Sequence, residues 1–113
     1  MFTSHAADTK RAASQLAAAL DRYDQDLAIL VAHGYDPELY SRMARRFDEM
    51  RMFAAALPRL SVTWVTLLIS RVDLTHSLYL AHNGNASSVE RQFTAHTAAV
   101  AALKRQCADL MRG

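Results

Sequence analysis

The sequence predicts an all-α protein, an antiparallel up-down-up-down four-helix bundle. The chain of 113 residues is 51% hydrophobic, has only three Gly and two Pro, and contains no segment with the alternating pattern of a strand. Its apolar residues instead recur at spacings of three and four, which places them on one side of a helix. We expect helices at about 4–33, 37–57, 60–82 and 87–111, in a single domain covering 1–113.

The first predicted helix, about 4–33, has one apolar seam and a clear end. Gly34 is suited to the left-handed conformation that commonly terminates a helix. His33 lies in the last turn, where the helix dipole favours a positive charge. The seam consists of Ala13, Leu16, Leu20, Tyr23, Leu27 and Leu30.

The second predicted helix, about 37–57, has the clearest start in the chain. Asp36 is a favourable N-cap and Pro37 suits the first helical position, while Tyr35 and Tyr40 are spaced as a hydrophobic staple. The seam of this helix mirrors that of the first helix about position 35, as expected for an antiparallel hairpin. Pro58 ends the helix, unless the chain continues through it as one kinked helix. The seam consists of Tyr40, Met43, Phe47, Met50, Ala54 and Leu57.

The third predicted helix, about 60–82, carries two apolar edges on opposite sides, so periodicity alone does not identify the buried one. We name the edges by their composition. The valine edge consists of Val62, Val65, Ile69, Val72, His76 and Tyr79. The leucine edge consists of Leu60, Trp64, Leu67, Arg71, Leu74 and Leu78.

The fourth predicted helix, about 87–111, follows a turn at 82–85 and starts with a capping box formed by Ser87 and Glu90. Its seam mirrors the valine edge about position 86, whereas the leucine edge has no such match. We therefore expect the valine edge to face the core beside the fourth helix. The seam consists of Val89, Phe93, His96, Val100, Leu103, Cys107 and Leu110.

The leucine edge then needs another partner. We predict that it is the interface of a homodimer with Trp64 as its anchor, because Trp is enriched among the residues that dominate interface energies. The alternative is that this edge packs against the first or second helix of the same chain. The predicted interface residues are Leu60, Trp64, Leu67, Leu74 and Leu78.

The predicted layers also bring a polar cluster into the core. We expect its members to hydrogen-bond one another, because buried polar groups are stable only when they have partners. Its members are Tyr40, His76, Tyr79 and His96. The alternative is a cofactor- or metal-binding bundle in which His76 and His96, with Met43 in the same layer, supply the ligands. Two His and one Met are too few for a closed zinc site, and the seams carry no carboxylate, so we expect neither a metal nor a cofactor.

No catalytic motif is present, since the chain lacks a Gly-rich phosphate loop and a plausibly spaced Ser/His/Asp or Cys/His set. We expect a non-catalytic protein, without catalytic residues, that acts through protein–protein contacts by self-association or as an adaptor or regulator of an unidentified partner.

Charge and cysteine content bear on the possible partners of the protein and on its cellular compartment. The net charge is only +2, and the arginines of the second helix alternate with acids, so we expect no nucleic-acid partner. The charged and polar residues within 60–82 argue against a membrane span. Asp21, Asp24 and Asp26 are predicted to be a solvated face. Cys107 is the single cysteine and no secretory signal is recognisable, which predicts a cytoplasmic protein.

Overall fold

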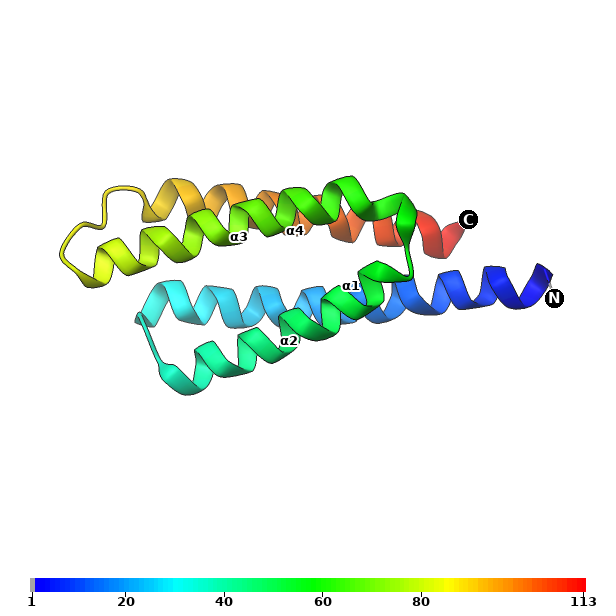
Figure 1. Cartoon of the computed structure of the whole chain (residues 1–113), viewed down its shortest axis with the longest axis horizontal. Coiled ribbons are helices and arrows are strands. Elements are labelled where there is room, and N and C mark those ends of the chain that lie inside the picture. The colour runs from blue at the N-terminus through cyan, green and yellow to red at the C-terminus, as the bar shows by residue number, and fades with distance from the viewer. Residues whose placement is uncertain (1) are drawn as a thin grey trace.

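The computed structural model describes residues 2–113 and confirms the antiparallel four-helix fold (Figure 1). The helices are α1 (Phe2–His33), α2 (Pro37–Ala55), α3 (Ser61–His82) and α4 (Val89–Arg112), with a short 3-10 helix, η1 (Pro58–Leu60), between α2 and α3. The molecule is elongated, with extents of 56 × 24 × 17 Å. The two hairpin turns lie at one end, and the η1 corner lies at the other end with the start of α1 and the end of α4.

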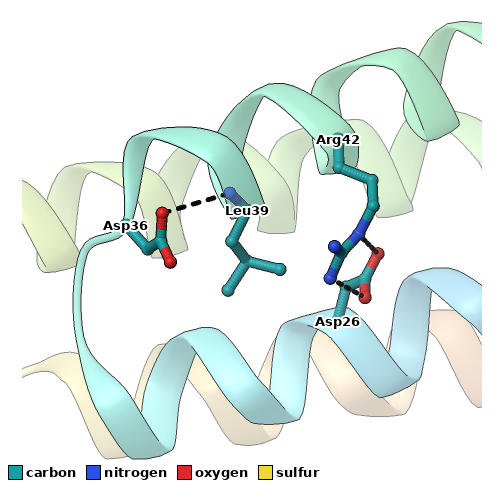
Figure 2. Close-up of polar contacts among 4 residues, drawn as sticks. All are labelled: Asp26, Asp36, Leu39 and Arg42. Carbon is teal, nitrogen blue, oxygen red and sulfur yellow. Dashed lines mark hydrogen bonds and ion pairs between the residues drawn. The ribbon is translucent and has the colours of Figure 1, made fainter.

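The turn between α1 and α2 has the predicted chemistry. Gly34 adopts a φ of +85°, and its N–H donates to the carbonyl of Leu30 at 2.8 Å. Asp36 is the N-cap of α2, and its carboxylate accepts from the backbone N–H of Glu38 at 2.9 Å. It also accepts from the backbone N–H of Leu39 at 3.4 Å (Figure 2). These contacts satisfy N–H groups that have no partner within the helix, so the local sequence fixes where the chain reverses.

The start of α4 differs from the prediction. The N-cap is Ser88, without a side-chain capping bond, and the Ser87–Glu90 capping box does not form. Both serine hydroxyls are engaged elsewhere: Ser87 donates to the side chain of Asn85 at 2.8 Å, and Ser88 hydrogen-bonds Ser77 of α3 at 2.8 Å. The turn is therefore tied to α3 instead of being capped locally.

The core of the α1–α2 hairpin and the inner face of α4 lie where the seams predict them. All six seam residues of α1 are buried, and Tyr40 is the only seam residue of α2 that is half-buried. The middle of the α4 seam, from His96 to Cys107, is also buried. Periodicity with a single apolar face was sufficient for these three helices.

The orientation predicted for α3 is wrong. The valine edge faces solvent, and the leucine edge faces the core, where Leu60, Leu67 and Leu74 are buried. Trp64 and Leu78 are half-buried and pack against the same core. The residues predicted to form a homodimer interface thus lie inside their own chain, as in the alternative considered for that edge.

Polar contacts give a physical reason for this orientation. Ser70 and Ser77 lie on the inner side of α3 and are both buried. Ser70 hydrogen-bonds His96 of α4, and Ser77 hydrogen-bonds Ser88. Turning the valine edge inward would expose both serines and leave Nδ1 of the buried His96 without a partner, which costs free energy.

The neighbouring pairs α1–α2, α1–α4 and α3–α4 pack along their lengths, whereas α2 and α3 meet through large side chains. Phe47 of α2 stacks on Trp64 of α3, with ring centroids 5.1 Å apart. The guanidinium of Arg71 lies over the Phe47 ring, 4.1 Å from its centroid. A cation over an aromatic ring is electrostatically favourable, so these three residues close the fourth side of the bundle.

Three ion pairs join α1 to its neighbours, so the acidic residues predicted as a solvated face are partly structural. Asp26 is buried and takes two hydrogen bonds from Arg42 of α2, at 3.2 Å to Nε and 2.9 Å to Nη2 (Figure 2). Lys104 of α4 pairs with Asp21 at 2.9 Å and with Asp24 at 3.3 Å. These pairs hold the register of α1 against both α2 and α4.

Within residues 2–113, no single helix combines the length and apolarity needed to cross a bilayer. The segments Pro37–Ala55 and Pro58–His82 pass that test only when joined, and the chain bends by 114° between them. This bend also rules out one kinked helix running through Pro58.

Candidate functional site

A hydrogen-bonded chain centred on His96 links three helices in the core. His96 is fully buried, and its Nε2 lies 2.7 Å from the hydroxyl of Tyr23 on α1. Its Nδ1 lies 2.6 Å from Oγ of Ser70 on α3. Ser70 in turn donates to the carbonyl of Leu67 at 2.9 Å.

The last of these bonds fixes the direction of the others. Because the Ser70 hydroxyl gives its proton to Leu67, its oxygen accepts from Nδ1–H of His96. Nε2 is then unprotonated and accepts from the Tyr23 hydroxyl. Every polar group in the chain is satisfied while the imidazole remains neutral.

The surroundings favour the same protonation states. Burial, assisted by the charge of Arg71, lowers the pKa of His96 to about 4. Burial also raises the pKa of the Tyr23 hydroxyl, and Arg71 opposes this through its charge and a side-chain hydrogen bond. The network is therefore uncharged at neutral pH, with the Arg71 cation beside it.

The predicted polar cluster contains only one residue of this network. His96 is buried, but His76 and Tyr79 are exposed because the valine edge faces outward, and Tyr40 is half-buried. Tyr23 was assigned to the seam of α1 without a polar role. The signal for that role is its position, since a tyrosine within an otherwise aliphatic seam needs a hydrogen-bond partner when buried.

The same geometry does not bring together the three residues that the cofactor alternative requires as ligands, because His76 is exposed whereas His96 and Met43 are buried. His76 lies on the outer side of α3, and both ring nitrogens of His96 have partners. Met43 is buried in the α1–α2 core. Among the described residues, no group of three or more His, Cys, Asp or Glu side chains is placed to hold a metal ion.

Cys107 is fully buried, and burial raises the pKa of its thiol to about 11. The thiol is protonated at neutral pH, whereas nucleophilic and metal-binding cysteines react as thiolates. Cys107 therefore acts as a small apolar core residue.

A small cavity lies where α2 and α3 diverge. Its volume is about 20 Å³, and the polar residues in its lining are Tyr23, Tyr40, Arg71 and Thr75. That volume corresponds to about one water molecule and is far below the roughly 300 Å³ of ordinary ligand pockets. The cavity has no room for an organic ligand in this conformation.

The surface feature of the molecule that most resembles a binding site is the valine edge of α3. Its apolar side chains remain exposed by the following fractions: Val62 79%, Val65 50%, Ile69 59%, Val72 65% and Tyr79 65%. With the exposed His76 between the last two, they form a continuous line of about 25 Å at 1.5 Å per residue. The spacings of three and four are those of a helix that packs against another helix.

The positions beside this line carry little charge. Thr66, Asp73 and Leu80 follow one side of the valine edge, and Asp73 is the only acid or base among them. Arg71 lies on the opposite side of α3, over Phe47. Depletion of charge is typical of the centre of a protein–protein interface.

The structure thus presents two features from which function can be argued, a saturated polar network inside and an apolar helix edge outside. The polar groups of the first are buried and paired with one another, whereas the second leaves apolar surface in water. Comparison of the chain with protein-family models, with curated proteins and with solved structures gives no match.

Proposed function

We propose that the chain is a non-catalytic helical-bundle protein that acts through protein–protein contacts, with the valine edge of α3 as its contact surface. The observation that carries this proposal is the exposure of five large apolar side chains in one line along one helix. Soluble monomers seldom expose apolar residues in such a contiguous arrangement, and the patches that do occur are often functional.

The size of the patch supports the proposal. A fully buried aliphatic side chain is worth about 1.5–3 kcal/mol at about 25 cal/mol per Å², which corresponds to roughly 60–120 Å² of apolar surface. The tyrosine ring contributes more than an aliphatic side chain. Scaled by their exposed fractions, the four aliphatic residues and the tyrosine together offer roughly 250–450 Å², which is the size of the largest apolar patch on a typical monomer and is often functional.

Among the side chains that the structure describes, from residue 6 onward, the other exposed large apolar residues do not form a comparable surface. Ile29, Tyr35 and Met52 belong to α1, the first turn and α2, respectively. Single exposed apolar residues are common on soluble proteins and need no partner. Apolar exposure is concentrated on one element, and that element is the proposed contact helix.

The contact surface can be tested in cells by site-specific photo-crosslinking. A photoreactive phenylalanine derivative placed at Ile69 should form adducts of defined mass, because the partner covers this position. The same derivative at Gln25, on the exposed side of α1, is the matched control and should give none. Adducts at neither position, or equally at both, would refute the valine edge as the contact surface.

A further inference from the structure

Resting on the proposed function, we infer that the partner on the valine edge is a second copy of this chain. The two α3 helices run antiparallel about a two-fold axis that passes between Ile69 and Val72. The interface is isologous, so each copy contributes the same surface. The inference rests on three properties of the edge: its register, its distribution of side-chain sizes and its area.

The register of this pairing follows from the heptad spacing. Val62, Ile69 and His76 occupy one heptad position, and Val65, Val72 and Tyr79 occupy the other. A two-fold axis between Ile69 and Val72 sets every residue of the first type opposite one of the second, as in antiparallel coiled coils. A shift of one heptad in either direction would leave two of the six positions unpaired.

The sizes of the side chains complement one another in the same register. Val62 faces Tyr79 of the second copy, Val65 faces His76, and Ile69 faces Val72. A parallel pair would instead place Tyr79 against itself at one end and Val62 against itself at the other. Alternation of large and small residues across facing positions fills an interface evenly, and opposed helix dipoles also favour the antiparallel arrangement.

The area is close to the lower limit for a specific dimer. Two copies of the valine edge bury roughly 500–900 Å² of apolar surface, and the flanking residues bring the total to about the 1,000 Å² that a specific interface requires. The low charge beside the edge means that no strong like-charge repulsion opposes the contact. An interface at the lower end of the size range predicts an association that is reversible on dilution.

The self-association is tested with the purified chain by sedimentation equilibrium or light scattering from about 1 µM to about 1 mM. We expect a reversible change from one to two copies of 12.6 kDa. Ile69→Asp should weaken it by about 100-fold or more, since both copies then place a carboxylate in the apolar contact. Met52→Asp, which alters an exposed apolar residue on α2, should leave it unchanged.

The orientation is tested by disulfide trapping. An equal mixture of Val62→Cys and Tyr79→Cys chains should form a mixed disulfide dimer, whereas Val62→Cys alone should not, because its two cysteines lie about 25 Å apart in the antiparallel pair. Wild-type protein is the control, since its only cysteine is buried. Trapping by Val62→Cys alone would overturn the antiparallel arrangement.

The outcomes separate this inference from the proposed function. A chain that stays monomeric up to about 1 mM, while Ile69 still crosslinks in cells to a protein of different mass, overturns the second copy and retains the contact surface. A monomeric chain without crosslinks at Ile69 overturns both. A dimer that is insensitive to Ile69→Asp places the interface elsewhere and overturns the inference.

Discussion

Tyr23 and His96 lie 73 positions apart in the sequence and are joined by a 2.7 Å hydrogen bond in the centre of the bundle. Their rings also meet edge-on, with centroids 5.6 Å apart. Ser70 extends the contact to a third helix through the other ring nitrogen. Three helices are therefore positioned by one neutral imidazole.

Tyr23→Phe should lower the free energy of unfolding by about 1–3 kcal/mol, because the mutation leaves Nε2 of His96 buried without a donor. Chemical denaturation monitored by circular dichroism measures this change. Tyr35→Phe removes an exposed hydroxyl and should alter the stability by less than about 0.5 kcal/mol. Equal effects of the two substitutions would contradict a structural role for the buried hydroxyl.

Stability should decrease as the pH falls from about 6.5 toward 4. The pKa of His96 is about 4 in the folded protein and about 6.5 in an unfolded chain, so the unfolded state binds the additional proton in this window. The stabilisation is complete above pH 6.5, and its loss amounts to on the order of 3 kcal/mol by pH 4. Denaturation curves at several pH values measure it.

His96→Gln removes this titration and retains the other histidines, so it is the appropriate reference. The pH dependence of wild type minus that of the variant should isolate the contribution of His96. Parallel pH profiles for the two proteins would show that His96 is not held neutral by the fold.

Arg42→Ala should destabilise the protein more than Asp26→Asn. Removal of the arginine leaves a buried carboxylate without its cation, whereas the asparagine leaves only a half-exposed guanidinium, which water can solvate. The urea midpoints of the two variants give the comparison. Arg51→Ala breaks an exposed pair with Asp48 and should change stability by less than about 0.5 kcal/mol.

Phe47→Leu should loosen the contact between α2 and α3 without unfolding the chain. The shorter side chain no longer stacks on Trp64 or supports Arg71, so the emission of the only tryptophan should shift to longer wavelength. Phe47→Ala should have the same effect and cost about 3–5 kcal/mol, since the ring is almost completely buried. Unchanged emission in both variants would show that the ring does not hold the tryptophan in place.

The sequence was sufficient for the parts of the fold that depend on local rules. Gly34, Asp36 and Pro37 mark the first hairpin through backbone geometry and capping, which operate within a few residues. Helices with one apolar face, such as α1 and α4, have one way to pack. Their seams could therefore be assigned without knowledge of the neighbours.

The orientation of α3 could not be assigned in this way, because both of its edges satisfy the helical periodicity. The choice depends on Ser70 and Ser77, which receive partners only after α4 is in place. His76 and Tyr79, which were predicted to be buried, are exposed for the same reason, whereas His96 on α4 is buried as predicted. Asp26 was likewise unpredictable, since its burial depends on the approach of Arg42 from α2.

The separation between Tyr23 and His96 also has a kinetic consequence. The α1–α2 hairpin can form from contacts between nearby residues, but the tyrosine on its inner side has no acceptor until the fourth helix has been synthesised. Contacts between distant residues slow folding, because the chain entropy is lost before the contact forms. We therefore expect docking of the last helix, rather than formation of the individual helices, to limit the rate at which a newly made chain reaches its final state.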